Sequence, residues 1–109
     1  MKNVLKISDF GLSRFANEVA ELASRVGTLP YMSPQVLDQE QNYSYKCDIW
    51  SFGVICYLLA TSVLPWKMYS DQNLSFETMK AICKKGIEFP SDSKVNEQLK
   101  SLIQGCLQF

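Results

Sequence analysis

Three short motifs carry the side chains of this chain that are suited to chemistry. The first is Asp9-Phe10-Gly11, which follows a short apolar run. The second is Gly27–Gln35, with the sequence GTLPYMSPQ, and the third is Asp48–Val54, with the sequence DIWSFGV. Taken alone, an Asp-x-Gly tripeptide indicates an ordinary turn, in which the aspartate caps the backbone and the glycine takes a positive φ. The order of the three motifs is therefore more informative than any one of them.

Several other kinds of chemistry are excluded by residues that are missing or wrongly spaced. The chain has no histidine, which excludes every mechanism that uses an imidazole base. Its glycines are never two residues apart, so it has neither a glycine-rich phosphate loop nor a Walker motif. Its cysteines are Cys47, Cys56, Cys83 and Cys106, and this wide spacing without a Cys-x-x-Cys pair argues against a zinc site. We expect reduced, mostly buried thiols in a cytoplasmic protein.

The overall composition is that of a soluble globular core. The chain has 109 residues, of which 47% are hydrophobic, with 11 basic and 11 acidic side chains. Such a length allows one small domain or part of a larger one, and the hydrophobic content rules against disorder. A net charge of zero gives no general attraction for nucleic acid or for an anionic membrane. The most apolar run, Ile49–Ala60, is shorter than the roughly 20 residues of a membrane span.

Local signals place the motifs on helices and loops. Val4–Ser8 has the pattern of a short strand, and residues 12–34 are expected to form an ordered loop because they carry Gly27, Pro30 and Pro34. Four helices are expected, namely Pro34–Leu37, Lys46–Thr61, a third between Ser75 as N-cap and Gly86 as stop, and a fourth that follows Asn96 and is still running at Phe109. The sequence therefore predicts a mainly α fold.

In this order, the three motifs resemble the C-terminal lobe of eukaryotic serine/threonine protein kinases. The resemblance covers nearly the whole chain and implies that residues 1–109 are a partial protein kinase domain, with a short strand, an activation segment and about four helices. It implies transfer of the γ-phosphoryl group of ATP, held with Mg²⁺, to a serine or threonine of a protein substrate. Met32–Gln35, Lys46–Asp48 and Leu64–Trp66 are loosely similar to autophagy-type (Unc-51-like) and calcium/calmodulin-dependent-type kinases, and the sequence does not choose between these two.

The resemblance assigns the first motif to the site of ATP and metal binding. Asp9 matches the aspartate that binds Mg²⁺, a hard cation that prefers oxygen ligands. Phe10 matches the aromatic residue whose packing differs between the active and inactive states, and Gly11 would permit the backbone rotation between them. Residues 9–35 as a whole match the activation segment.

The second and third motifs match supporting positions of the lobe. Thr28 matches a hydroxyl that hydrogen-bonds to the catalytic aspartate and lysine. The surface that receives the residue after the target hydroxyl is matched by Leu29, Pro30 and Tyr31. Asp48 matches the aspartate that holds the catalytic loop through its backbone amides, and it also suits the dipole of a helix N-terminus. Trp50 and Gly53 match positions in the central buried helix.

Two features bear on regulation and activity. Gln35 stands where the family usually has a glutamate that pairs with an arginine further along the lobe, and a neutral amide can only hydrogen-bond. This departure bears on activity more than on fold. Ser24 stands where many members carry a phosphorylation site, and we hypothesise that phospho-Ser24 pairs with Arg14 and orders the loop. An unmodified, solvated serine is the alternative.

Several catalytic elements of the family have no counterpart in the sequence. There is no His-Arg-Asp catalytic loop and no strand lysine for the ATP phosphates. We therefore expect the N-lobe, the catalytic loop and the end of the C-lobe to lie outside these residues, and the chain alone to be inactive. A non-catalytic, pseudokinase-like binding module is the alternative. Apolar side chains that would face the absent parts are Ile49, Trp50, Val54 and Leu58, so we expect the chain to need the missing kinase portion or a partner protein for stability.

Overall fold

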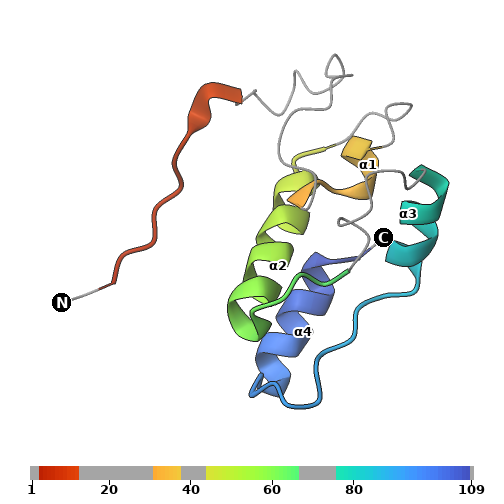
Figure 1. Ribbon diagram of the computed structural model, residues 1–109. Helices are drawn as coiled ribbons and strands as arrows, with labels where there is room; N and C mark the ends of the chain where they lie inside the picture. Colours follow the sequence, from red (N-terminus) through yellow and green to blue (C-terminus); the bar gives the residue numbers. More distant parts are fainter. Residues whose placement is uncertain (1–2, 13–30, 38–43, 67–75, 109) are drawn as a thin grey trace.

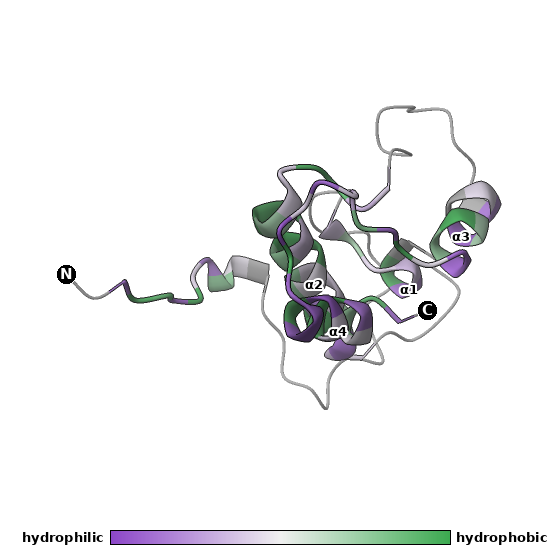
Figure 2. Ribbon diagram, turned by 90° about the horizontal axis from the view of Figure 1, so that it is seen from below, coloured by the Kyte–Doolittle hydropathy of each residue, from purple (hydrophilic) through white to green (hydrophobic). Residues whose placement is uncertain are grey.

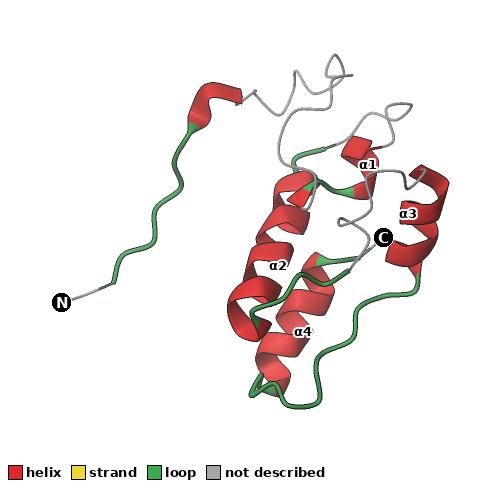
Figure 3. Ribbon diagram, in the orientation of Figure 1, coloured by secondary structure: helices red, strands yellow, loops and turns green. Residues whose placement is uncertain are grey.

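The computed structural model describes residues 3–12, 31–37, 44–66 and 76–108, and every structural statement below concerns these residues. Their regular elements are the 3₁₀ turn η1 (Phe10–Leu12) and the helices α1 (Pro34–Leu37), α2 (Lys46–Thr61), α3 (Phe76–Lys84) and α4 (Glu97–Cys106). Within this part of the chain the regular structure is helical throughout, with no strand (Figure 3). The predicted mainly α fold is confirmed, and α1 and α2 have the predicted bounds.

Helix α2 is the central element of the helical body. It ends at Ser62, which adopts the left-handed conformation (φ 64°) and donates its backbone N–H to the Leu58 carbonyl, 2.7 Å away. Pro65 follows shortly and prevents the helix from resuming. At the other end the Ser44 hydroxyl oxygen accepts the backbone N–H of Lys46 at 3.2 Å, which satisfies one of the free donors of the first turn.

Helices α2 and α4 pack antiparallel against each other in the helical body (Figure 1). Gly53 permits their close approach, because a Cβ atom placed there would lie 2.6 Å from the Cβ of Cys106 and 3.0 Å from a methyl carbon of Leu107. Ile103 lies on the facing side of α4 and is completely buried. The glycine of the third motif is thus a packing residue, as the resemblance implies.

A cluster of buried side chains forms the core between these helices, and its members are Trp50, Val54, Tyr57, Trp66, Cys83, Ile103 and Leu107. The rings of Trp50 and Trp66 are stacked, with centroids 5.3 Å apart and planes 11° from parallel. Trp66 also donates its indole N–H to the Gly86 carbonyl at 3.2 Å, and the Tyr57 hydroxyl donates to the Glu88 carbonyl. These bonds fasten the segment after α3 to the core.

The core corrects part of the stability prediction. Trp50 is 2% exposed and Val54 is 0% exposed, so both side chains are already buried by residues of this chain. Leu58 is half-buried, whereas Ile49 remains 48% exposed as expected. The cover for Trp50 comes from Trp66, a residue far along the chain that no local pattern connects to it.

One face of α2 stays open to solvent, although its sequence is apolar on all sides. We call this face the apolar stripe, and it consists of Ile49, Phe52, Ile55 and Leu59. Figure 2 shows the apolar character along α2, in contrast to the mixed polar and apolar surfaces of α3 and α4. This exposed face includes Ile49, which was predicted to face parts of the lobe that are absent from the sequence. Among the described residues, no helix has both the length and the hydropathy to span a membrane.

Helix α4 begins as predicted and ends earlier than predicted. The Asn96 side-chain oxygen accepts the backbone N–H of Leu99 at 2.8 Å, so Asn96 is the N-cap. The helix ends at Cys106, before the expected end at Phe109, and Leu107 turns away while still donating its N–H to the Ile103 carbonyl at 3.0 Å. This turn buries the side chain of Leu107 in the core. The free energy gained from this burial outweighs that of one further helical hydrogen bond.

Residues 3–12 extend away from the helical body (Figure 1). The predicted strand at Val4–Ser8 is not formed, because a strand needs a neighbour for its backbone hydrogen bonds and no described segment lies beside it. Its apolar side chains are open to solvent, with Leu5 92% exposed. The sequence has the apolar pattern of a strand, but the neighbouring strand that it would pair with is not among the described residues.

Candidate functional site

The predicted site residues fall into two places in the structure. Asp9, Phe10 and Gly11 lie at the end of the extended N-terminal segment, whereas Tyr31, Gln35 and the residues of the third motif lie on the helical body. The remaining predicted residues, Thr28, Leu29, Pro30, Ser24 and Arg14, lie outside the described residues. The two described groups are not brought together.

The first motif forms a solvent-exposed turn. Asp9 has a positive φ of 65°, whereas Gly11 does not. Among the described glycines, a positive φ is found at Gly86. Asp9 thus takes the position that the ordinary-turn interpretation gave to the glycine, which is possible because aspartate tolerates the left-handed region. Phe10 is 66% exposed, and a Cβ atom at Gly11 would meet only a carboxylate oxygen of Asp9, at 3.8 Å. Nothing on the helical body holds this turn.

As for a metal, the chemistry of Asp9 fits Mg²⁺, and its surroundings among the described residues are incomplete. A carboxylate oxygen is a donor that Mg²⁺ prefers. Across residues 3–12, 31–37, 44–66 and 76–108, no three aspartate, glutamate, cysteine or histidine side chains gather in a way that would hold a metal ion. Asp9 can therefore supply one ligand of a site whose other ligands come from elsewhere.

The end of the second motif is fixed firmly to α2. The Ser51 hydroxyl donates to the Tyr31 carbonyl oxygen at 2.6 Å, across 20 positions of sequence. After Tyr31 the side chains of Met32, Ser33 and Val36 are buried. The Ser33 hydroxyl oxygen accepts the backbone N–H of Val36 at 3.3 Å, so Ser33 begins α1 as predicted. Ser51 belongs to the third motif and to the predicted central helix, but its contact with Tyr31 was not predicted, since a serine inside an apolar helix carries no local signal for it.

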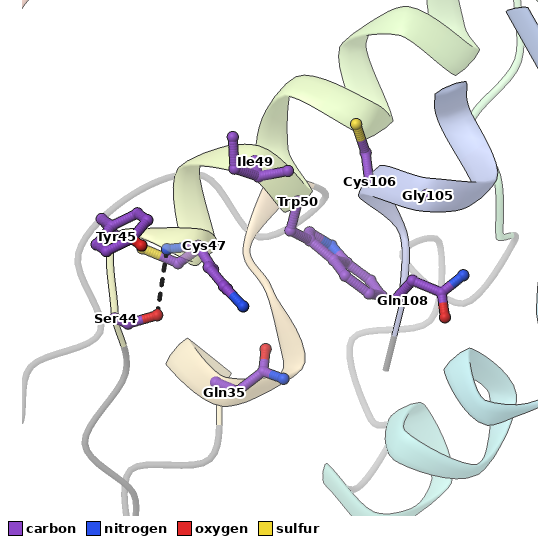
Figure 4. A pocket seen from close by; sticks show the side chains of 10 residues that line it. Gln35, Ser44, Tyr45, Cys47, Ile49, Trp50, Gly105, Cys106 and Gln108 are labelled. Carbon is purple, nitrogen blue, oxygen red and sulfur yellow. Dashed lines mark hydrogen bonds between the residues drawn. The ribbon is translucent and has the colours of Figure 1, made fainter. Parts of the chain in front are cut away.

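Gln35 lies in a pocket between α1, the start of α2 and the end of α4, with a volume of about 510 Å³. Figure 4 shows it below the start of α2, with Trp50 and Gln108 across the opening. The pocket is lined by Gln35, Ser44, Tyr45, Lys46, Cys47, Ile49, Trp50, Gly105, Cys106 and Gln108. Lys46 is the charged residue of this lining, so Gln35 shares the pocket with amide, hydroxyl and cationic side chains.

Asp48 and Trp50 occupy the first turns of α2. Asp48 is exposed and accepts a hydrogen bond from the Cys47 thiol, with 3.9 Å between sulfur and oxygen. Its charge stabilises the helix N-terminus through the dipole, which is the simpler of the two roles predicted for it. The indole nitrogen of Trp50 is buried without a hydrogen-bond partner in the described part of the chain. Trp50 therefore acts here through stacking and burial.

The four cysteines are free thiols, and burial makes each a weaker acid. Burial raises the pKa of Cys83 from 9.0 to about 11, and it also raises the pKa of Cys56 and of Cys106. The pKa of Cys47 is raised by burial and by the neighbouring carboxylate of Asp48. Of the four, Cys83 is fully buried and the others are half-buried, so the prediction of mostly buried thiols holds fully for one. Protonated thiols are poor nucleophiles, which argues against cysteine chemistry at this surface.

The chain is similar to known protein kinases over its whole length. The protein kinase domain family matches residues 1–109. The chain is 35% identical over 108 residues to calcium-dependent protein kinase 3 of Plasmodium berghei, an alignment that covers 97% of this chain and 19% of the relative. It is 34% identical over 108 residues to the serine/threonine-protein kinase ATG1 of Debaryomyces hansenii, with 97% and 12% covered.

A third relative is the MAP kinase-activated protein kinase 2 of Oryctolagus cuniculus, which is 36% identical over 111 residues, with 98% of this chain and 30% of the relative covered. The chain thus spans a third or less of the length of these relatives. They include a calcium-dependent kinase and an ATG1 kinase, so the comparisons do not single out either of the two subfamilies suggested by the motifs. Because the family matches every residue of the sequence, this chain belongs to the protein kinase family.

Proposed function

We propose that this chain is the part of a serine/threonine protein kinase that runs from the metal-binding aspartate through the activation segment to the central helices of the C-terminal lobe. The observation that carries the proposal is the anchoring of Tyr31 on α2 by Ser51, because a backbone held in one position is what a surface that positions a substrate requires. The parent enzyme would transfer the γ-phosphoryl group of ATP to a serine or threonine hydroxyl of a protein.

Mg²⁺ and ATP are the cofactors of this reaction. In the proposed role, Asp9 would hold Mg²⁺ through a carboxylate oxygen, and a bound Mg²⁺ would supply positive charge beside the phosphates of ATP. The exposed position of Asp9 suits a ligand that is completed by groups outside the described residues. The four free thiols support a reducing, cytoplasmic setting.

The experiment that tests the function is a chimaera. The segment of the MAP kinase-activated protein kinase 2 of Oryctolagus cuniculus that aligns with this chain is replaced by residues 1–109, and transfer of phosphate from ATP to a peptide substrate of that host is measured. We expect the chimaera to phosphorylate the peptide, and the 109-residue chain alone to show no transfer because it lacks a His-Arg-Asp loop. A folded chimaera without transfer would contradict the proposal.

The same chimaera tests the alternative of a non-catalytic, pseudokinase-like binding module, which is supported by Gln35. Gln35 and Lys46 line the same pocket, so a carboxylate at position 35 would share this pocket with a cation. If Gln35 is a minor departure within an active kinase, Gln35→Glu raises an existing activity modestly. If the chain derives from a non-catalytic module, both versions of the folded chimaera are inactive.

The apolar stripe supports a further part of the proposal, namely that the chain packs against the rest of its kinase domain or against a partner protein. Leu59, the most exposed member, is 80% open to solvent. An exposed apolar surface of this kind favours association. We therefore expect the isolated chain of 12.4 kDa to sediment above its monomer mass, and Leu59→Gln to shift it toward the monomer. A wild-type chain that is monomeric and melts cooperatively would contradict this.

The proposed pairing of phospho-Ser24 with Arg14 has its own test. Intact-mass analysis of the protein from its native cell is expected to show phosphate within residues 12–28. Absence of phosphate there, in protein from active cells, would contradict the pairing.

A further inference from the structure

The hydroxyl of Ser51 has two backbone acceptors within reach. One is the Tyr31 carbonyl oxygen at 2.6 Å, and the other is the Cys47 carbonyl oxygen, one helical turn earlier in α2, at 3.2 Å. A hydroxyl has one proton and can donate it to one acceptor at a time. The shorter distance lies within the usual range for an O–H···O hydrogen bond and the longer one lies beyond it, so the bond to Tyr31 is the one that is made.

We propose that Ser51 is a positioning residue that holds the backbone of Tyr31 on α2 and releases it by turning its hydroxyl to the Cys47 carbonyl. This inference rests on the proposed function, which assigns Leu29–Tyr31 to the surface that receives the substrate. Ser51 itself does not touch the substrate.

The geometry makes the release reversible at low energetic cost. When the segment at Tyr31 moves away, the Ser51 hydroxyl keeps a partner inside its own helix, which is a common hydrogen bond for serine. Tyr31 is half-buried, so a water molecule can then hydrogen-bond to its carbonyl oxygen. Neither the Ser51 hydroxyl nor the Tyr31 carbonyl is then left without a partner, and both arrangements can therefore be populated.

The neighbours of the hydrogen bond define what moves and what stays. Downstream of Tyr31, Met32, Ser33 and Val36 are buried and fix the end of the segment to the body. Ser51 is thus the last described attachment before the part of the second motif that carries Thr28. A change at Ser51 should alter the segment upstream of Met32 while it leaves the core of α2 and α4 intact.

A matched control is available on the same helix. The Thr61 hydroxyl donates to the Tyr57 carbonyl, also one turn earlier, at 2.8 Å, and its other hydrogen-bond partner is Val63, just beyond the end of α2. Thr61→Ala therefore removes the intrahelical bond and the contact with Val63, while the hydrogen bond from Ser51 to Tyr31 stays. The conservative variant Ser51→Thr keeps the hydroxyl that the proposal requires.

The test uses the chimaera described above, with the peptide KM, the ATP KM and kcat measured for Ser51→Ala, Ser51→Thr and Thr61→Ala. Loss of one hydrogen bond corresponds to about a 2- to 10-fold effect. We expect Ser51→Ala to raise the peptide KM by about that factor, with the ATP KM and kcat unchanged, and Ser51→Thr to restore it. Equal changes for Ser51→Ala and Thr61→Ala, or an unchanged peptide KM, would overturn the proposal.

A second measurement separates this proposal from the function on which it rests. Amide hydrogen exchange of Tyr31 and Met32 is followed in the 109-residue chain, where no phosphoryl transfer is needed. We expect about 2- to 10-fold faster exchange in Ser51→Ala than in Thr61→Ala. If the unmodified chimaera is inactive but this difference is found, the proposed function fails and the positioning role stands. If exchange is the same in both variants, the positioning role fails whatever the activity of the chimaera.

Discussion

The N-terminal segment and the helical body of this chain have similar apolar content and different structural outcomes. Residues 3–12 include the large apolar side chains of Val4, Leu5, Ile7 and Phe10, and these four are exposed. The body places comparable side chains between α2 and α4, where Ile103 and Val54 are wholly buried. The difference shows that burial here depends on a partner surface, since the body contains its own and the segment does not.

This difference separates the two kinds of site residue. The body presents Tyr31 and Gln35 in fixed positions, because hydrogen bonds and buried neighbours hold them. The segment presents Asp9 at the end of an unsupported chain. The proposed substrate-receiving surface can therefore be held by contacts within this chain, whereas the proposed metal site requires groups that lie beyond the described residues.

The largest contrast is expected from matched isoleucine truncations. Ile103→Ala should lower the free energy of unfolding by about 2–5 kcal/mol, because it leaves a cavity in the core. Ile7→Ala removes an exposed side chain and should change it by less than about 0.5 kcal/mol. Urea unfolding followed by circular dichroism at low protein concentration measures both. Equal effects would mean that the body has no core of its own.

A smaller contrast is expected from the two glycines. Gly53→Val places side-chain atoms against Cys106 and Leu107 and should destabilise the body by about 1–3 kcal/mol. Gly11→Val meets only the Asp9 carboxylate at 3.8 Å and should have no measurable effect on the same urea midpoint. If Gly53→Val is tolerated, the close packing of α2 on α4 is not as the structure has it.

Two asparagines offer a third contrast. Asn96→Ala removes the cap of α4 and should cost about 1 kcal/mol of stability. Asn3→Ala, in the exposed segment, should be neutral, and Asn96→Ser should recover most of the loss because serine also caps well. Thermal unfolding of the three variants checks this. A neutral Asn96→Ala would show that α4 is held by packing alone.

The smallest effect at neutral pH comes from Cys83. Its pKa is raised from 9.0 to about 11 by burial, so the folded state keeps the thiol protonated where the unfolded state loses its proton. The resulting stabilisation is complete below pH 9.0 and decreases as the pH rises toward about 11. The urea midpoint should fall over this range, and less so in Cys83→Ala. An identical pH dependence in both proteins would contradict the buried, protonated thiol.

Local signals in the sequence were sufficient for some elements of the fold. Ser33-Pro34 predicted the start of α1, the apolar run predicted α2, and Asn96 predicted the cap of α4, because each depends on neighbouring residues. The strand at Val4–Ser8, the cover over Trp50 and the open face at Ile49 depend on contacts far along the chain, which no local pattern contains.

The same distinction applies to the site. The three motifs identified the family, and the family match confirms it. The roles that the family implies for single residues stay predictions. The hydrogen bond from Ser51 to Tyr31 joins residues 20 positions apart and became visible only in the structure. The roles of Thr28, Leu29, Pro30, Ser24 and Arg14 stay predictions, since these residues lie outside the described parts of the chain.

The most direct test of the account is the Mg²⁺-dependent transfer of phosphate by the chimaera with Asp9→Asn, set beside Asp92→Asn as a matched exposed aspartate. The account predicts that transfer is lost with Asp9→Asn and kept with Asp92→Asn, while the urea midpoint of the body is the same in both. Full activity of Asp9→Asn, or equal losses in the two variants, would contradict the claim that the exposed turn supplies the metal ligand of a kinase.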